Sequence, residues 1–234
     1  MESIINEYSD LVIETMGLDS LEIDDKIKQE IAKDVLNMII TSTSYKPSPD
    51  VIVKRIQRHI KDLYKIVAYR ILESGLKPTP QQLDFIVSYG EEVLVPHISE
   101  LYKLAKEYGK DYVVSMLQYV WEKHGKPSPI ECPKCGFRAI MPDFSCLICG
   151  YVVTEDYIRE KLNFEEKFKE YVAMASVAEL KEVLDLGYVL VSEIDIKSPK
   201  ERIDMTSKIY YPIYLRSRET SLIIEEINSR KLPI

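Results

Sequence analysis

Histidine and tryptophan are scarce in this chain, and the familiar catalytic patterns are missing. The 234 residues include one tryptophan and three histidines, His59, His97 and His124. No histidine has a partner at the spacing of a catalytic triad or of a metal-binding pair. The sequence also lacks HExxH, GxSxG, phosphate-loop and dinucleotide glycine patterns. We therefore predict no catalytic residues, and an enzyme with an unfamiliar site stays a third possibility for the function.

Long apolar runs and thermolabile amides are scarce as well. No apolar run approaches the roughly 18 residues that a membrane helix needs. No charged, apolar and small-residue leader begins the sequence, so we expect a cytoplasmic protein that does not act at a membrane. The chain has 29% charged residues but only four asparagines and five glutamines. This composition is typical of thermophile proteins, which use many ion pairs.

The charge balance is negative. A net charge of −7 argues against a basic surface that covers the whole protein, although it leaves room for local basic patches. With 46% apolar residues, the chain can bury a real core. We expect a mainly α protein in three parts: a helical bundle at 1–129, a four-cysteine segment at 130–153 and a small α+β domain at 154–234.

The cysteines are the strongest chemical signal in the sequence. They form two Cys-x2-Cys pairs, Cys132 with Cys135 and Cys146 with Cys149, and a glycine follows each pair. Four thiolates at this spacing can surround one ion tetrahedrally, which predicts a structural zinc site with no position left for water. Iron would need the same ligands, so it stays an alternative. Disulfides or a redox pair are the remaining alternatives, and a reducing cytosol disfavours them.

The two cysteine knuckles also carry a family resemblance. The segments CPKCG at 132–136 and CLICG at 146–150 resemble a zinc ribbon, over about residues 130–153. This module is common in archaeal and eukaryotic transcription and translation proteins, and it also serves in enzymes and scaffolds. The resemblance therefore implies a zinc ion and a function of this broad kind. Rubrerythrins also join helices to four cysteines, but the Glu-x-x-His pairs of their di-iron centre are absent here.

Apolar residues at helical spacing predict a bundle of about six helices before the cysteines. The expected helices cover about residues 2–16, 24–40, 50–73, 80 to Pro96, 98–108 and 111–124. Thr79 and Gln82 form a capping box at the start of the fourth helix. Pro96 should kink or end that helix, and Asp111 should cap the last one.

The helix expected at 50–73 carries a row of basic residues opposite its apolar face. The row consists of Lys54, Arg58, Lys61 and Lys65. Such a row is commonly the solvated face of a bundle helix, but it can also follow a phosphate backbone or an acidic partner. We include these four side chains among the candidate nucleic-acid-binding residues.

Helices and then strands are expected after the cysteines. One helix at 155–174, broken near Asn163, precedes another that Ser176 and Glu179 cap. Apolar residues then alternate at 188–196 and 208–215, which predicts the two strands of a hairpin. Pro212 places the second strand at an edge of the sheet. A last helix is expected at 219–230.

Residues 175–218 resemble a winged helix. The resemblance rests on the helix at 177–184, the strand that follows Gly187, and the strand that returns from Lys208. It implies that the helix reads base edges and that the hairpin, called the wing, lies along phosphates or the minor groove. The acidic residues of the helix disfavour a role in base readout and favour protein docking.

The wing is rich in basic residues. Six basic residues and two acidic ones lie between Lys197 and Arg218. The candidate nucleic-acid-binding residues of the wing are Lys200, Arg202 and Lys208. We therefore predict a cytoplasmic, zinc-containing protein that binds DNA or another nucleic acid or takes part in transcription. The alternative is a structural or protein-interaction protein, including a homo-oligomer.

Overall fold

The computed structural model describes residues 2–40, 46–201 and 208–230. The chain divides into two compact units, Met1–Gly125 and Lys126–Ile234. The cysteine segment belongs to the second unit. Its separation from the C-terminal part as a domain of its own stays a prediction.

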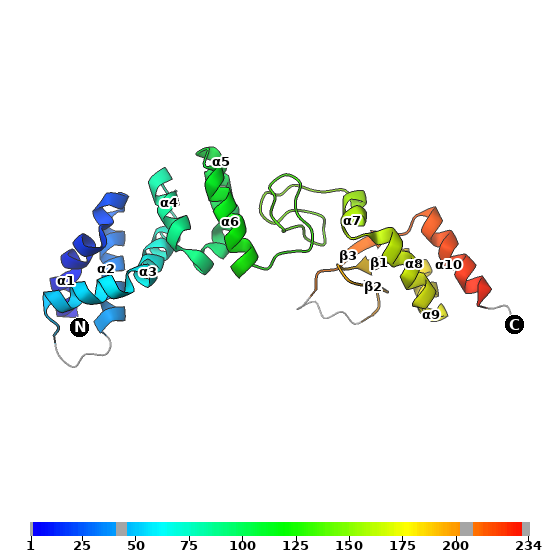
Figure 1. Cartoon of the computed structure of the whole chain (residues 1–234), viewed down its shortest axis with the longest axis horizontal. Coiled ribbons are helices and arrows are strands. Elements are labelled where there is room, and N and C mark those ends of the chain that lie inside the picture. The colour runs from blue at the N-terminus through cyan, green and yellow to red at the C-terminus, as the bar shows by residue number, and fades with distance from the viewer. Residues whose placement is uncertain (1, 41–45, 202–207, 231–234) are drawn as a thin grey trace. The chain divides into compact units, whose positions relative to one another are not determined.

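Helices make up the regular structure of the first unit, among the residues described there (Figure 1). The elements are α1 (Glu2–Met16), the short 3₁₀ helix η1 (Leu18–Leu21), α2 (Asp25–Ile40), α3 (Pro49–Glu73), α4 (Pro80–Tyr89), the 3₁₀ helix η2 (Glu91–His97), α5 (Ile98–Glu107) and α6 (Asp111–His124). The long helix α3 contacts α1 and α2 as well as α4 and η2. Its inward side chains Ile52, Ile56, Leu63 and Val67 are fully buried. The helical bundle predicted from apolar spacing is confirmed.

Two details at the helix ends differ from expectation. The fourth helix ends at Tyr89 and does not reach Pro96. The break comes at Glu91, whose φ of 44° lies in the left-handed region and cannot continue an α-helix. Asp111 does not cap α6, because the cap position is Lys110 and no side chain caps that end. The Asp111 carboxylate instead pairs with Lys106 at 2.8 Å. The predicted capping box at Thr79 is present.

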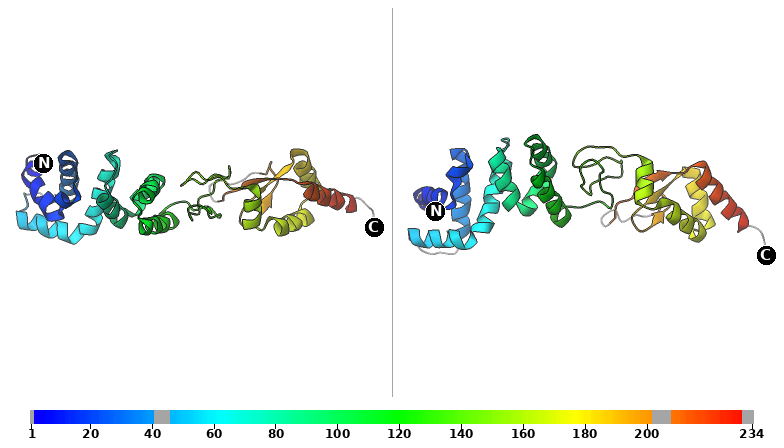
Figure 2. Two further views of the ribbon diagram at one scale, coloured as in Figure 1. Left: turned by 90° about the horizontal axis from the view of Figure 1, so that it is seen from above. Right: turned by 45° about the horizontal axis from the view of Figure 1, so that its top comes forward.

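In its described residues, the second unit joins the cysteine segment to four helices and a small sheet. Its elements are α7 (Glu155–Lys161), α8 (Phe164–Met174), α9 (Val177–Leu186), β1 (Tyr188–Val191), β2 (Ile196–Lys197), β3 (Tyr211–Tyr214) and α10 (Ser217–Ser229). Asn163 has a left-handed backbone and separates α7 from α8, as expected. Helix α7 contacts β3, α8 contacts β2, and α9 contacts β1 (Figure 2).

The sheet corrects one prediction. The expected single strand at 188–196 is really β1, a tight turn and β2, which returns antiparallel beside it. Ser192 closes the turn, because its N–H donates to the carbonyl of Asp195 at 2.9 Å. Strand β1 therefore lies in the middle of the order β2-β1-β3. Pro212 lies in β3, and so at a sheet edge as predicted.

Candidate metal centre

The two cysteine knuckles have the same backbone geometry. In each knuckle, the N–H of the first cysteine donates to the carbonyl five residues later, and the glycine N–H donates back to the first cysteine's carbonyl. The four bonds are 2.8 to 2.9 Å long. Gly136 and Gly150 have φ values of 74° and 71°, in the left-handed region that glycine adopts at little cost. This shared turn directs both sulfur atoms of each pair toward the same point.

The four sulfur atoms converge on one space. The Sγ atoms of Cys132 and Cys149 are 3.7 Å apart, and those of Cys135 and Cys146 are 3.6 Å apart. All four Sγ atoms lie within 4.8 Å of one another. A tetrahedron with metal–sulfur bonds of about 2.3 Å has edges of about 3.8 Å, whereas a disulfide brings its sulfurs to about 2.05 Å. The cysteines are therefore placed to bind one metal ion and are not disulfide-bonded.

Burial and hydrogen bonds between thiols shift the pKa values of the free cysteines. Cys132, Cys135 and Cys146 are buried, and Cys149 is half-buried. A hydrogen bond from Cys135 lowers the pKa of Cys146 to about 5, and the same bond together with burial raises the pKa of Cys135. Burial raises the pKa of Cys132. Ion binding should therefore release protons from this cluster, since metals bind thiolates.

Two tyrosines fasten the cysteine segment to the C-terminal elements. The hydroxyl of Tyr211, on β3, donates to the carbonyl of Ile140 at 2.8 Å. The hydroxyl of Tyr157, on α7, donates to the carbonyl of Glu131 at 2.9 Å. Burial raises the pKa of Tyr211 to about 12, so this hydroxyl keeps its proton. Sequence reasoning missed both contacts, because only the abundance of tyrosine in the last strand hinted at them.

The basic row on α3 is largely free of ion pairs. Lys54, Arg58 and Lys61 are exposed, and no described carboxylate pairs with them. Lys65 differs, since its ammonium lies 2.6 Å from Glu91 and 3.4 Å from Glu92. The helix is also kinked within this row, because His59 has the non-helical angles φ −111° and ψ 16°.

The carboxylates beside Lys65 form a second polar cluster. Ligand atoms of Glu91, Glu92 and His124 lie within 4.8 Å of one another. Because the ammonium of Lys65 already contacts both carboxylates, we interpret the group as a network of ion pairs. Sequence reasoning missed it, since the residues come from three separate elements.

Internal contacts engage the described candidates of the wing. Lys208 pairs with Asp195 at 3.3 Å. Lys200 is exposed, but its N–H donates to Glu182 at 2.9 Å. Glu182 also accepts a bond from the Ser198 hydroxyl at 3.0 Å, so this carboxylate of α9 holds the chain after β2. Arg202 lies outside the described residues.

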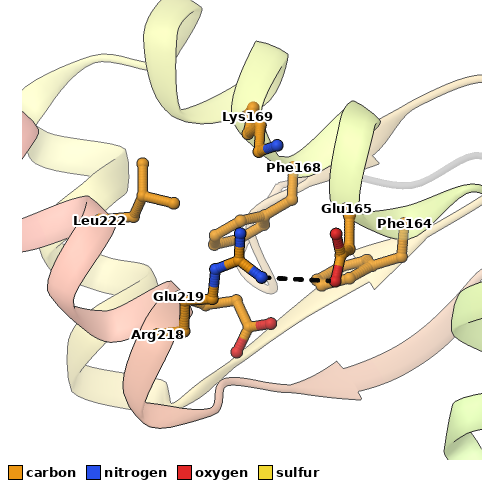
Figure 3. Close-up of a pocket in the computed structure, with 7 residues that line it drawn as sticks. All are labelled: Phe164, Glu165, Phe168, Lys169, Arg218, Glu219 and Leu222. Atoms are coloured by element: carbon orange, nitrogen blue, oxygen red, sulfur yellow. Dashed lines mark ion pairs between the residues drawn. The ribbon is translucent and has the colours of Figure 1, made fainter.

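A small pocket lies between α8 and α10 (Figure 3). Apolar side chains and four charged ones line it: Phe164, Phe168, Leu222, Glu165, Lys169, Arg218 and Glu219. An ion pair of 3.7 Å links Arg218 to Glu165 at this pocket. The two phenylalanine rings are only 1% and 2% exposed, and they stack with centroids 5.1 Å apart. The rings therefore support the packing of the two helices more than they offer a binding surface.

Comparisons with protein-family models, with curated proteins and with solved structures find no match for this chain. In the described part of the chain, no helix combines the length and the apolar character that a bilayer crossing requires.

Proposed function

We propose that the ion bound by the four cysteines is zinc and that its role is structural. The supporting observation is the set of sulfur–sulfur distances, 3.6 and 3.7 Å, which suits tetrahedral coordination by four thiolates. Four protein ligands fill the coordination sphere, so the ion has no open position for a substrate. Elemental analysis of the purified protein should return one equivalent of zinc. One equivalent of iron would replace this assignment, and less than one equivalent of both metals would contradict it.

We further propose that the protein binds nucleic acid through the exposed basic face of α3, defined as Lys54, Arg58 and Lys61. The observation that carries this proposal is the lack of ion pairs on that face among the described residues. Unpaired cations can neutralise phosphates without first breaking an internal contact. Lys54 and Lys61 are seven residues apart, so the three basic side chains span about two turns of the helix.

The wing supplies the second part of the nucleic-acid proposal. Of the two wing candidates that the structure describes, Lys200 has the more available side chain, whereas Lys208 would have to leave Asp195 to contact a phosphate. Arg202 is included on sequence grounds alone. Because of this difference, we assign the larger share of binding to α3.

The salt dependence of binding to duplex DNA tests the proposal. Replacing Lys54, Arg58 and Lys61 together by glutamine should weaken binding. The slope of log K against log salt should also become less negative by about 2.7. The matched control replaces Lys26, Lys33 and Lys103, which are equally exposed in the first unit, by glutamine. An affinity no tighter than millimolar at low salt, or equal losses in both variants, would contradict the assignment.

The alternative function is protein interaction without nucleic acid. It is favoured by exposed apolar side chains on the ribbon, where Leu147 is 53% and Val152 is 63% exposed. A chain that fails to bind DNA but forms a defined oligomer in light scattering would support this alternative.

A further inference from the structure

Helix α6 exposes a row of large side chains that no described residue of the first unit covers. Tyr112 is 53%, Met116 37% and Tyr119 64% exposed, and Lys123 is the next exposed residue along the row. At about 100° per residue these four positions fall within about 60° of one another on the helix. Large apolar side chains gathered on one exposed helix face mark an interaction surface more often than scattered single ones do. We call Tyr112, Met116, Tyr119 and Lys123 the α6 seam.

The seam is held in place before any partner binds. The hydroxyl of Tyr112 donates to the Asp84 carboxylate, and the Lys110 ammonium lies 5.6 Å from the centre of the Tyr112 ring. The Lys123 ammonium lies 5.7 Å from the centre of the Tyr119 ring. Rings fixed in this way lose little conformational entropy on association, which favours binding.

The spacing of the seam is the same in both directions. Its members are four, three and four residues apart, so a two-fold axis between residues 117 and 118 maps the row onto itself. A two-fold dimer requires such a self-complementary patch. We propose that the α6 seam binds a second copy of this chain, with the two α6 helices antiparallel. The proposal does not depend on nucleic-acid binding.

This arrangement pairs unlike groups at each position. Met116 faces Tyr119 of the second copy, which is a favourable sulfur–aromatic contact. Tyr112 faces Lys123 of the second copy, which is a cation–π contact. Only the antiparallel arrangement pairs these unlike groups, because a parallel one would bring Lys123 near Lys123.

The size of the seam predicts a weak dimer. A helix of 14 residues is about 21 Å long, so the seam buries less than the roughly 800 Å² per partner of a standard stable interface. We expect a dissociation constant between about 10 μM and about 1 mM. Sedimentation of the metal-loaded full chain across this range should show a monomer–dimer equilibrium.

A first variant tests the seam itself. Tyr119→Ser should weaken the dimer at least tenfold, an effect of about 1.4 kcal/mol. Tyr69→Ser on α3 removes another exposed tyrosine, 44% exposed, and should leave the dimer unchanged. Circular dichroism should show that both variants keep the helical content of the wild type.

A pair of charge variants tests the antiparallel arrangement. Tyr112→Lys and Lys123→Glu should each weaken self-association, because the first brings two ammonium groups together across the two-fold axis and the second sets a carboxylate against the ring of Tyr112. An equimolar mixture of these two variants should form a heterodimer, since the new ammonium then meets the new carboxylate. A misfolded variant would fail in the mixture too, so recovery also shows that both chains are folded. Lys103→Glu on α5 adds the same charge away from the seam, and this control should not restore the association of Tyr112→Lys.

Several outcomes would overturn the proposal. One is a wild-type chain that stays monomeric at about 1 mM, the upper end of the expected range. Another is a dimer that Tyr119→Ser leaves intact. A third is a mixture of the two charge variants that associates no better than each variant alone. If the wild type is monomeric and Tyr119→Ser weakens binding to an oligonucleotide, the seam belongs to a nucleic-acid surface instead.

Discussion

Arg159 on α7 and Glu219 on α10 form a buried ion pair across 60 residues of sequence. Their Nη1 and Oε1 atoms are 3.0 Å apart, and the side chains are only 9% and 12% exposed. Arg159 also pairs with Glu155 at 2.7 Å, donates to the carbonyl of Tyr214, and covers the ring of Phe164 at 4.5 Å. One guanidinium thus joins α7, α8, β3 and α10, which makes it the polar centre of the second unit.

Replacing Arg159 by methionine should destabilise the second unit by about 3–5 kcal/mol, because Glu219 would be left buried without its partner. Arg159→Lys should also destabilise it, since an ammonium cannot reproduce the planar set of donors. Chemical denaturation followed by tyrosine fluorescence measures the change. Arg218→Met is the control: Arg218 is 71% exposed, so its pair with Glu165 should contribute less than about 1 kcal/mol. Equal effects of the two methionine variants would contradict the role given to Arg159.

Tyr211 and Tyr214 lie on the same strand but should differ in their response to loss of the hydroxyl. Tyr211→Phe leaves the buried carbonyl of Ile140 without its donor and should cost about 1–3 kcal/mol. Tyr214 is 60% exposed, so Tyr214→Phe should change the free energy of unfolding by less than about 0.5 kcal/mol. Thermal denaturation of the metal-loaded protein measures both. If the two variants match, the hydroxyl of Tyr211 does not fasten the cysteine segment.

Features that depend on neighbouring residues could be predicted from the sequence. The cysteine knuckles and the capping boxes at Thr79 and Ser176 need only a few adjacent residues, and the structure contains them. The helix break at Asn163 is equally local. Such signals are complete within one or two turns of chain, so no knowledge of the fold is needed to read them.

Features that depend on distant residues could not be predicted in this way. The pairing of Arg159 with Glu219 and of Lys208 with Asp195 joins segments that no sequence pattern links. Counting the basic residues of the wing therefore overestimated how many of its positive charges are free of internal ion pairs. The turn at Ser192 was missed because the alternation of apolar residues continues through it, and alternation alone does not distinguish one strand from two.

The turn at Ser192 should make the second unit sensitive to acid. Burial raises the pKa of Asp195, but hydrogen bonds from Ser192, Tyr210 and Lys208 outweigh that effect, so the folded-state pKa is lowered. A lowered pKa stabilises the fold above the unfolded value of about 3.9, and this contribution is lost as the pH falls through the folded value. Unfolding free energies measured between about pH 6 and pH 3 should therefore fall less steeply in Asp195→Asn than in the wild type. Asp185→Asn, on the exposed side of α9, should follow the wild-type curve.

Removal of the metal ion should unfold the cysteine segment while the first unit keeps its helices. Residues 131–152 contain only isolated β-bridges, so we expect the fold of this segment to depend on an ion bound by the four cysteines. A structural zinc ion of this kind contributes on the order of 10 kcal/mol of binding free energy to folding. Cys149→Ser or a strong chelator should therefore abolish amide protection across residues 130–153, as measured by hydrogen exchange.

Leu147→Ser alters the same knuckle at a side chain that is 53% exposed, so this control should keep the metal and the protection. The helices α1 to α6 have a core built from their own side chains, so their amides should exchange as in the wild type. If the amides of the cysteine segment stay protected from exchange without metal, side-chain packing, and not the ion, holds the knuckles together.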